Sequence, residues 1–425
     1  MRKILFLLMF PVLVFAQGYT SYFTGNTTNI TTSTSIGICL MGGATENDNA
    51  MKWLLQKANG GDIVVLRSTG TNGYNNYLYS TLGVNVNSVE TLVITSAAGA
   101  INPYVLNKVA NAEMIWFAGG NQFQYISYFK DNALEDLLNN HINIKNAPIG
   151  GTSAGMAILC GKYFSAQNGS VTSAQALANP FNSLITIGQN DFLSVPFLQN
   201  VTTDTHFDNP DRKGRLMTFV ARTALLQNSR TFGIASNEYV SVCIDETGKA
   251  RVFGDFPNYQ EFAYFMQPNC QTSFLPETCV ANSPLTWDRN AEAIKTYKVA
   301  GTQNGANFFQ LSDWQTGSGG SWENWKVING VFSSAAGIPN TCAFLSISAF
   351  ENEKIKIFPI PFQNSINLNG FEKAEISISD ANGKLMFENY FSNEAKIATE
   401  TFSSGIYLIK IVNNGKTTTK KIIKN

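Results

Sequence analysis

The chain of 425 residues is poor in histidine and in charge. It has two histidines, and charged residues make up 14% of it, where ordinary domains have roughly 25%. Lysine plus arginine and aspartate plus glutamate both number 30, so the net charge is zero. The charge balance predicts no nucleic-acid partner, and the absence of any CxxC or Cys/His cluster from the sequence predicts no metal site.

Long apolar runs are also scarce, and the one at the start is too short to span a bilayer. Arg2 and Lys3 precede an apolar core at 4–15, and Ala16 is the small residue that signal-peptide cleavage requires. We therefore expect residues 1–16 to be a signal peptide. The remaining chain would leave the cytoplasm, where disulfides can form.

The six cysteines fall into two kinds of surroundings. Cys39, Cys160 and Cys243 lie inside apolar runs and are predicted to be buried thiols. Cys270 and Cys279 lie in a polar, proline-containing stretch. In an oxidising compartment these two are our hypothesis for a disulfide pair.

Short apolar strands alternate with helical stretches through the first half of the chain. Strands are predicted at 35–43, 62–70, 91–97, 114–120 and 147–151, and one long helix at 122–140. The apolar runs are continuous rather than alternating, which is typical of strands buried on both faces. The pattern predicts an α/β fold with a doubly wound, mostly parallel sheet. Ligands of such sheets bind at the carboxyl ends of the strands.

The pattern changes after about residue 230. A hairpin is predicted around DETGK, whereas residues 256–345 give no clear assignment. From about residue 348 turn signals recur roughly every ten residues, which predicts a small β-sandwich of six or seven strands. We expect a signal peptide at 1–16, a main domain at 17–345 and a β-domain at 348–425.

The motif GTSAG, residues 151–155, stands between a predicted strand and a predicted helix. That setting is typical of a nucleophile elbow, in which flanking glycines permit a sharp turn and expose the serine hydroxyl. Ser153 would then be a nucleophile, and the Ala154 N–H would point toward an oxyanion. The alternative is a turn that binds an anion without covalent chemistry.

A serine nucleophile needs a base, and only two histidines are available. His141 is expected to be a solvated surface residue, at the amino-terminal edge of the strand that leads to Ser153. His206 lies in a polar loop before a strong helical run and is the base if there is one. A carboxylate must orient the imidazole of His206. Spacing alone does not choose among the four candidates Asp204, Asp208, Asp211 and Glu238.

Two arginines near His206 could contact a substrate. Arg212 and Arg215 lie three positions apart and would share one face of a helix. They could hold a substrate carboxylate, or they could form ordinary surface salt bridges. Both interpretations stay open from the residues alone.

Four blocks stand in a characteristic order: FAGGNQ (117–122), IGGTSAGM (149–156), DTHF with RKGRL (204–207 and 212–216), and GIASNE (233–238). Together they resemble cyanophycinase and its relatives, which include dipeptidase E. The resemblance covers roughly residues 34–260. It implies a fold like that of class I glutamine amidotransferases, with serine in place of the cysteine nucleophile.

Position by position, the resemblance implies that Ser153 is the nucleophile, His206 the base and Glu238 the acid. Gly120 and Ala154 would supply the oxyanion-hole amides. The residues implied for the substrate pocket, which in cyanophycinases binds a β-aspartyl-arginine unit, are Gln122, Asp204, Arg212 and Arg215. The set implies a secreted serine peptidase that cleaves peptide or isopeptide bonds through an acyl-enzyme and requires no cofactor.

Two departures concern the pocket. Thr205 stands where cyanophycinases usually have glutamine, and Pro210 where they usually have a further arginine. Peptidase activity is therefore favoured over specificity for β-aspartyl or cyanophycin-like substrates. The alternatives are a non-catalytic ligand-binding protein of the same fold, or an amidase or esterase with the same three residues. A homodimer is a further hypothesis.

The tail carries FPIPF (358–362), DANGKL (380–385), SSGIYLIKI (403–411) and a basic end. It resembles the C-terminal sorting domain of the type IX secretion system of Bacteroidetes, although Ile360 stands where asparagine is more common. The resemblance implies recognition by that secretion machinery and export across the outer membrane. The protein would then be secreted or held at the cell surface.

Overall fold

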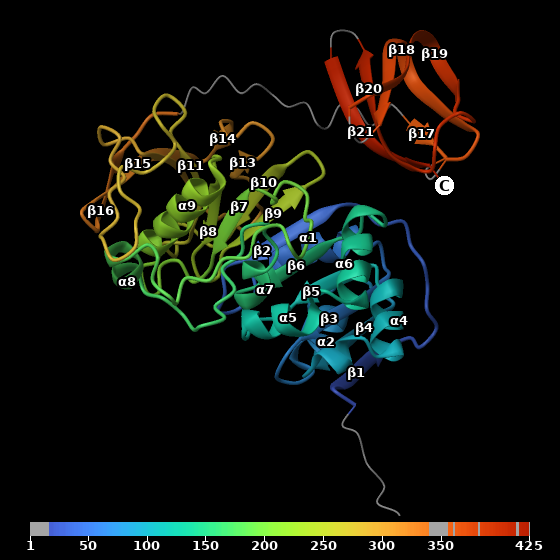
Figure 1. Ribbon diagram of the computed structural model, residues 1–425. Coiled ribbons are helices and arrows are strands. Elements are labelled where there is room, and N and C mark those ends of the chain that lie inside the picture. The colour runs from blue at the N-terminus through green and yellow to red at the C-terminus, as the bar shows by residue number, and fades with distance from the viewer. Residues whose placement is uncertain (1–16, 340–355, 360–361, 381–382, 414–415, 425) are drawn as a thin grey trace, which may run out of the picture. The chain divides into compact units, whose positions relative to one another are not determined.

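The computed structural model describes residues 17–339, 356–359, 362–380, 383–413 and 416–424. The chain divides into two compact units, Met1–Cys342 and Ala343–Asn425 (Figure 1). The expected signal peptide, residues 1–16, lies outside the described residues. Within the described residues, no helix combines the length and the apolar character that a membrane crossing requires.

The first unit is built on a ten-stranded sheet in the order β1-β4-β3-β5-β6-β2-β9-β10-β13-β14. Its strands are β1 (Tyr19–Gly25), β2 (Gly37–Met41), β3 (Asp62–Arg67), β4 (Ser88–Ile94), β5 (Met114–Phe117), β6 (Ile149–Thr152), β9 (Ser241–Asp245), β10 (Lys249–Phe253), β13 (Phe308–Gln310) and β14 (Gly317–Ser318). The central strands from β4 to β2 are parallel, and the flanking strands pair antiparallel. The predicted mostly parallel sheet is confirmed.

Helices cover both faces of this sheet, as two neighbouring residues of β5 illustrate. Trp116 packs in the cluster that contains Leu54 of α1 and Leu78. Phe117, which points to the opposite face, contacts the rings of Tyr125 and Phe129. The first face carries α1 (Asp48–Lys57), α2 (Gly73–Asn76) and the π-helical turn η1 (Tyr77–Thr81). The remaining early helices are α3 (Ala97–Ala100), α4 (Pro103–Asn111), α5 (Gln122–Phe129) and α6 (Ala133–Asn143).

The single helix predicted at 122–140 is wrong, because the chain breaks it in two. α5 ends at Phe129, and Asp131 adopts a left-handed conformation with φ 60°. The side chain of Asn132 then accepts a hydrogen bond from the backbone N–H of Leu134 and caps α6. A stretch that favours helix therefore contains the end of one helix and the N-terminal cap of the next.

A second sheet, in the order β16-β15-β12-β11-β8-β7, completes this unit. Its strands are β7 (Val201–Asp204), β8 (Phe232–Ser236), β11 (Phe262–Pro268), β12 (Ile294–Ala300), β15 (Gly320–Ile328) and β16 (Val331–Ala336), and the nearby helices are α7 (Ala154–Ala157), α8 (Ser173–Ala178) and α9 (Lys213–Gln227). Leu216 and Val220 of α9 pack with Met266 and Trp325 of this sheet. Four strands of the stretch that the sequence left unassigned, β11, β12, β15 and β16, belong to this sheet, whereas β13 and β14 belong to the first.

The disulfide hypothesis is wrong for Cys279. This cysteine is a free thiol, buried in the core cluster with Leu285 and Trp287. Its stretch reads as a polar loop, but the side chain points inward, away from an oxidising solvent. Cys270 is disulfide-bonded. The prediction that Cys39, Cys160 and Cys243 are buried free thiols is confirmed.

The second unit is an antiparallel β-structure, in agreement with the predicted β-sandwich. It contains five strands within the described residues: β17 (Lys356–Phe358), β18 (Ser365–Asp380), β19 (Leu385–Ala398), β20 (Gly405–Asn413) and β21 (Lys416–Lys424). This number is lower than the six or seven strands predicted. β18 is a long strand that runs through Asn369–Gly370, and its pairing with β19 shifts register between Asn369 and Lys373. Ile376, Ile397 and Ile409 lie in a core of its own.

Candidate active site

Ser153 occupies a strained corner between β6 and α7. Its backbone has φ 51° and ψ −113°, a conformation that residues with a Cβ rarely adopt. The Ser153 N–H donates to the carbonyl of Met41 in the neighbouring strand, at 3.0 Å. A strand, a sharp turn and a helix therefore present this hydroxyl at the carboxyl edge of the first sheet, as an elbow does.

His206 and Glu238 reach Ser153 from other parts of the fold. His206 follows β7 of the second sheet, and Glu238 lies in the loop between β8 and β9. The Ser153 Oγ and His206 Nε2 atoms are 2.9 Å apart, and His206 Nδ1 lies 2.6 Å from Glu238 Oε1. The structure thus joins three residues, distant in sequence, into one hydrogen-bonded chain.

The partners of His206 fix its tautomer. An ionised carboxylate can only accept, so Nδ1 carries a proton and donates it to Glu238. In a neutral ring Nε2 is then the acceptor for the Ser153 hydroxyl, which is the arrangement a general base needs. The hydrogen bond from His206, opposed by partial burial and aided by Asn209, lowers the pKa of Glu238 below its usual value. Glu238 therefore stays ionised near neutral pH.

A pair of glycines after β2 connects the three segments. The His206 N–H donates to the carbonyl of Gly42 at 2.8 Å, and the Tyr239 N–H donates to that of Gly43 at 3.0 Å. Gly43 has φ +126°, and a Cβ there would lie 2.3 Å from His206 Nε2. The imidazole can occupy its position only because residue 43 has no side chain.

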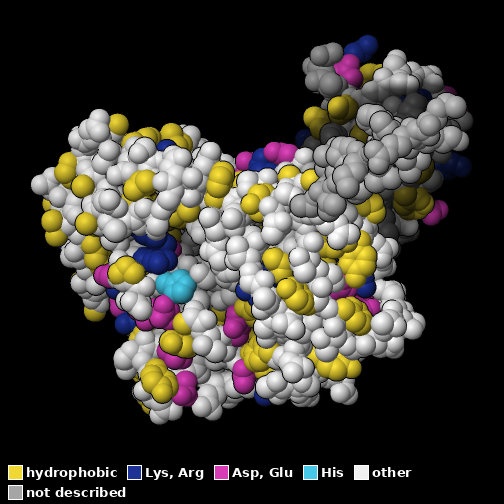
Figure 2. Space-filling view, turned by 90° about the horizontal axis from the view of Figure 1, so that it is seen from below, with side chains coloured by type: hydrophobic (Ala, Val, Ile, Leu, Met, Phe, Trp, Pro, Cys, Tyr) yellow, Lys and Arg dark blue, Asp and Glu magenta, His cyan; other side chains and the backbone are white. Residues whose placement is uncertain are grey.

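Ser153 and His206 open into a cavity of about 370 Å³. Its other lining residues are Ala44, Glu46, Arg67, Tyr74, Ala118, Gly119 and Thr152. Figure 2 shows a histidine in a hollow of the molecular surface, with basic side chains on one side and acidic ones on the other. This volume lies in the range of ligand-binding pockets, so a small ligand could reach the hydroxyl.

Backbone N–H groups for an oxyanion are present beside Ser153. Gly119 lines the cavity, and a Cβ on it would lie 3.6 Å from the Ser153 Cβ. Gly120, which follows, and Ala154, the first residue of α7, were the expected donors. Within the part of the chain that the structure describes, neither N–H makes a hydrogen bond to another residue. Both remain available to a ligand.

Asp204 and Arg215, two of the expected pocket residues, are occupied with each other. Their side chains are 3% and 6% exposed and form a two-pronged ion pair, with Arg215 Nε 2.8 Å from Asp204 Oδ2. The guanidinium also lies against the rings of Phe164 and Phe219. This pair supports the loop before His206, and neither residue lines the cavity of Ser153.

Gln122 and Arg212 also lie outside that cavity lining. The Gln122 Nε2 donates to the Phe164 carbonyl at 3.1 Å, and Arg212 Nη1 donates to the Thr205 carbonyl at 2.8 Å. Thr205, one of the two departures from the family pattern, is buried. The structure therefore brings together Ser153, His206 and Glu238, but not the four expected pocket residues around the same cavity.

The surface position expected for His141 is wrong. The side chain is 3% exposed, and its Nε2 lies 3.0 Å from the carbonyl of Pro148, just before β6. Burial lowers its pKa to about 4, so the ring is neutral near pH 7. It does lie at the amino-terminal edge of the strand, as expected.

Part of the first unit matches a known protein family. Residues 71–247 match the sequence model of Peptidase family S51. The match includes Ser153, His206 and Glu238, whereas the second sheet from β11 onward lies beyond it. Residues 356–425 match the Secretion system C-terminal sorting domain.

Two curated proteins that this chain is similar to carry the name cyanophycinase. They come from Synechococcus elongatus and Thermosynechococcus vestitus, and each is 25% identical to this chain over 171 residues. These residues are 40% of this chain and 48% of the relative, so the chain spans about half the length of the relatives it matches. A solved peptidase from an acI-B1 Actinobacterium has a TM-score of 0.40 and 14% identity, covering 54% of this chain and 93% of its own.

Three residues that the sequence did not single out line the Ser153 cavity: Glu46, Arg67 and Tyr74. Glu46 and Arg67 precede residue 71, where the family match begins. A signal for them existed, because each stands close to a glycine-containing strand end, after MGG and before STG. Charged residues at such ends of a parallel sheet face the ligand side.

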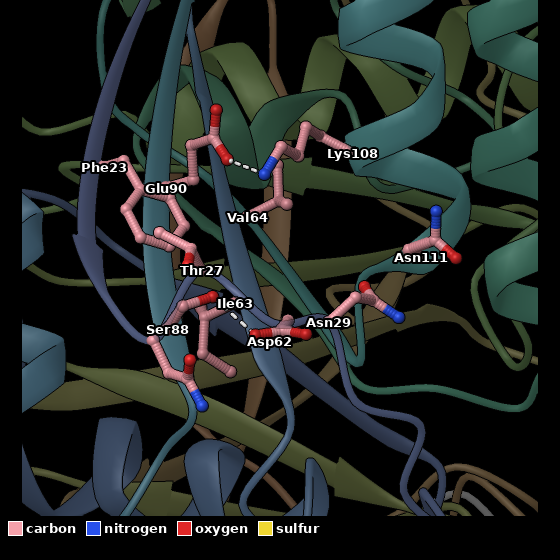
Figure 3. Close-up of a pocket in the computed structure, with 11 residues that line it drawn as sticks. Phe23, Thr27, Asn29, Asp62, Ile63, Val64, Ser88, Glu90, Lys108 and Asn111 are labelled. Carbon is pink, nitrogen blue, oxygen red and sulfur yellow. Dashed lines mark hydrogen bonds and ion pairs between the residues drawn. The ribbon is translucent and has the colours of Figure 1, made fainter.

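A second hollow is lined by residues of β1 and the loop after it, β3, β4 and α4 (Figure 3). Its volume is about 30 Å³, which is room for about one water molecule. Its charged residues already have partners, since Glu90 pairs with Lys108 at 2.8 Å and Asp62 accepts hydrogen bonds from Ser88 and Asn87. This hollow is part of the structural support of the sheet.

Proposed function

We propose that the chain is a serine-type peptidase in which Ser153 is the nucleophile, His206 the general base and Glu238 the residue that orients it. The observation that carries the proposal is the hydrogen-bonded chain of these three side chains at a strained corner, inside a match to a peptidase family. The cavity beside the hydroxyl and the two available backbone N–H groups add to it.

In the first half of the reaction, Ser153 Oγ attacks the carbonyl carbon of a peptide or isopeptide bond. His206 Nε2 takes the hydroxyl proton, and Glu238 stabilises the imidazolium through Nδ1–H. The N–H groups of Gly120 and Ala154 would stabilise the oxyanion. The C–N bond then breaks, His206 delivers the proton to the leaving amine, and Ser153 carries the acyl group as an ester.

In the second half, water replaces the amine. His206 takes a proton from the water as its oxygen attacks the ester carbonyl, and the oxyanion forms in the same place. The ester C–O bond breaks, the proton returns to Ser153 Oγ, and a carboxylic acid product leaves. The proposed reaction is therefore hydrolysis, with water as the only co-reactant.

The substrate class proposed is a peptide rather than cyanophycin in particular. The similarity to two relatives named cyanophycinase makes cyanophycin a candidate substrate. Asp204 and Arg215, however, satisfy each other in a buried ion pair and have no exposed group to offer. Thr205 and Pro210 also depart from the cyanophycinase pattern. We therefore extend peptide hydrolysis to this chain and leave cyanophycin as one substrate to be assayed.

The test is labelling of the purified protein with a serine-directed fluorophosphonate, followed by peptide mapping. We expect Ser153 to be labelled, and the Ser153→Ala variant to be neither labelled nor active on a library of short peptides, amides and esters. Ser127→Ala, which changes an exposed serine on α5, serves as the control and should keep both properties. An unlabelled, inactive wild type would leave a ligand-binding protein as the correct interpretation. Turnover of amides or esters alone would make it an amidase or esterase.

We further propose that the second unit directs export through the type IX machinery, so that the protein is secreted or surface-held. The match to a secretion sorting domain over residues 356–425 supports this. Deleting residues 348–425 in a native host should leave the protein in the periplasm, whereas full-length Ser153→Ala should be exported normally. Export of the truncated chain would rule out a sorting role.

A further inference from the structure

Two buried thiols face each other across neighbouring strands of the first sheet. Cys39 lies in β2 and Cys243 in β9, and the two residues are direct partners in the antiparallel pairing of these strands. The Cys243 thiol donates to Cys39 Sγ, and the two sulfur atoms are 3.7 Å apart. Neither thiol has a role in the proposed mechanism, although both strands border segments that do.

The backbone separation of this pair permits a disulfide. The Cα atoms of residues directly opposite each other on antiparallel strands are roughly 4.5–5.5 Å apart, and disulfides occur over a range of roughly 4.4–6.8 Å. To form the bond of about 2.05 Å, the sulfur atoms must approach by about 1.7 Å from their present 3.7 Å. Both side chains are packed in one core cluster with Leu54 and Trp116. Part of the approach must therefore come from the strands themselves.

A shift of these strands reaches the proposed catalytic residues through the backbone. Gly42 follows β2, and its N–H donates at 2.9 Å to the carbonyl of Val240, which precedes β9. The Gly42 carbonyl accepts from the His206 N–H at 2.8 Å. Val240 in turn lies two residues after Glu238. The two cysteines therefore lie on the two strands whose adjoining segments position the imidazole and its carboxylate.

Burial determines when the two thiols can react. Both side chains are fully buried. Burial, and after it the neighbouring Cys39 thiol, raises the pKa of the Cys243 thiol well above its ordinary value. Because the thiolate is the form that attacks a disulfide, exchange needs β9 to separate from β2, during folding or local opening. The chain does form a disulfide elsewhere, since Cys270 is disulfide-bonded.

We propose that Cys39 and Cys243 are a redox modification site, where exchange with a disulfide oxidant such as oxidised glutathione forms a cross-strand disulfide that displaces His206 from Ser153. The Cys39 thiolate attacks the oxidant, which gives a mixed disulfide and releases one thiol. The Cys243 thiolate then attacks the Cys39 sulfur and releases the second thiol. The two cysteines are oxidised, the oxidant is reduced to two thiols, and the two protons pass from the cysteines to these thiols. An excess of a small thiol reverses both steps.

The disulfide itself does not depend on the proposed function, whereas its effect on activity rests on the proposed peptidase. In the free-thiol form the Ser153 Oγ and His206 Nε2 atoms are 2.9 Å apart, so this is the active form. A displacement of about 1 Å near a reacting group can lower the rate about 100-fold. We expect kcat/KM to be at least about 10-fold lower in the disulfide form, and to return on reduction.

The test incubates the full chain for hours, at mildly alkaline pH, in buffers of different ratios of oxidised to reduced glutathione. A second sample is refolded from urea in the same buffers, so that burial does not exclude the oxidant. Free thiols are blocked with N-ethylmaleimide, and the peptides are mapped without reduction. We expect the Cys39 and Cys243 peptides to be linked in oxidising buffer and separate after treatment with dithiothreitol. Cys160, a buried thiol that contacts Thr203 rather than another sulfur, should stay free.

Activity is measured on the same samples, as the rate at which a fluorophosphonate labels Ser153 and as kcat/KM on a peptide. Wild type should lose activity as the linked fraction rises, and Cys160→Ala should respond in the same way. Cys39→Ala and Cys243→Ala should not respond to the glutathione ratio. These two variants keep the disulfide of Cys270, so they show whether that bond causes the response. The comparison of the two redox states of wild type stands even if a variant fails to fold.

Three results would overturn the inference: peptides that stay unlinked in both samples, linked peptides with unchanged activity, or a redox response that survives Cys39→Ala. These outcomes differ from failure of the proposed function. If Ser153 is labelled and peptides are hydrolysed equally at every glutathione ratio, the peptidase proposal stands and this inference falls. If Ser153 is labelled in neither redox state and no peptide is hydrolysed, the peptidase proposal falls, and peptide mapping alone decides whether the disulfide forms.

Discussion

Strand β6 has a histidine near each of its ends. At the amino end, His141 is buried against the Pro148 carbonyl, and burial lowers its pKa to about 4. At the carboxyl end, His206 lies beside the Ser153 hydroxyl, with its side chain 24% exposed. One ring is kept neutral by its surroundings, whereas the other faces a cavity and is held by a carboxylate.

The two histidines differ in their hydrogen-bond partners, although the residue type is the same at both ends of β6. A backbone carbonyl gives His141 one acceptor and no charge, so the ring stabilises the turn before the strand. His206 has a carboxylate on one nitrogen and a hydroxyl on the other, which is what proton transfer requires. The loops at the carboxyl edge of a parallel sheet supply such partners, and the opposite edge supplies structural support.

The strongest test of this comparison replaces each histidine with alanine. His206→Ala should lower kcat/KM about 10⁴-fold, because the proton transfers lose their base, while stability changes by about 1 kcal/mol or less. His141→Ala should do the reverse, lowering the free energy of unfolding by about 2–4 kcal/mol with kcat/KM nearly unchanged. The measurements are steady-state kinetics on a peptide found by library screening, and urea unfolding.

Tryptophan fluorescence suits the unfolding measurement, because all six tryptophans lie within the first unit, Met1–Cys342. The signal therefore follows that unit and is not affected by the tail. An equal loss of activity in the two variants, at temperatures where both are folded, would show that the two ends of β6 do not differ as described.

A second test asks whether the charged residues near His206 contribute to catalysis or to stability. Arg215→Gln should lower the free energy of unfolding by about 3–5 kcal/mol, because it leaves Asp204 as a buried charge without its partner. Arg212→Gln should cost about 1 kcal/mol, the loss of one hydrogen bond to the Thr205 carbonyl and of a longer contact, 4.0 Å, with Asp204. If Arg215→Gln instead raises KM while stability is unchanged, Arg215 contacts substrate, as the family resemblance implies.

The parts of the fold that could be predicted are those marked by patterns among residues close together in the sequence. The first sheet is marked by continuous apolar runs such as 62–67 and 114–117, and by a capping residue, Asn47, before α1. The second sheet lacks such signals because its strands pair over long separations, as β8 does with β11. Its core also depends on Trp287, which lies outside any strand. No pattern among neighbouring residues in the sequence predicts such a contact.

The site was predictable where one residue type was scarce or a motif was present. Ser153 follows from GTSAG, and His206 from the shortage of histidine. Glu238 followed only from the family resemblance, because the direction of its carboxylate depends on a loop fixed by Asp208 and Asn209. The spacing of Arg215 indicated which helix face it shares with Arg212, but not that Asp204 would meet that face.

The third test uses pH to separate the two ends of β6. The folded pKa of His141 is about 4 and its ordinary value is 6.5, so between these pH values the unfolded chain binds a proton that the folded chain does not. Stability from this residue is therefore constant above about pH 6.5 and falls by about 3 kcal/mol as the pH approaches 4. Urea unfolding at several pH values should show this loss in wild type.

The control is His141→Gln, which keeps a hydrogen-bond donor for the Pro148 carbonyl but cannot titrate. Its unfolding free energy should lack the part of the acid dependence that His141 contributes. His206→Gln should retain it. If wild type and His141→Gln lose stability in parallel below pH 6.5, the buried histidine does not remain neutral in the folded state.

The smallest effect expected comes from a single methyl group beneath His206. In Gly43→Ala the new Cβ would lie 2.3 Å from His206 Nε2, and backbone atoms fix its position, so the imidazole must move. Because His206 is the proposed base, a displacement of this size should lower kcat/KM about 10- to 100-fold. Gly83→Ala is the matched control, because Gly83 also has a positive φ, of +68°, and no atom lies within 4 Å of the added Cβ. Both variants carry backbone strain, so both should lose about 1 kcal/mol of stability. Only Gly43→Ala should lose activity, and equal kinetics in the two would mean that the imidazole position does not depend on the glycine after β2.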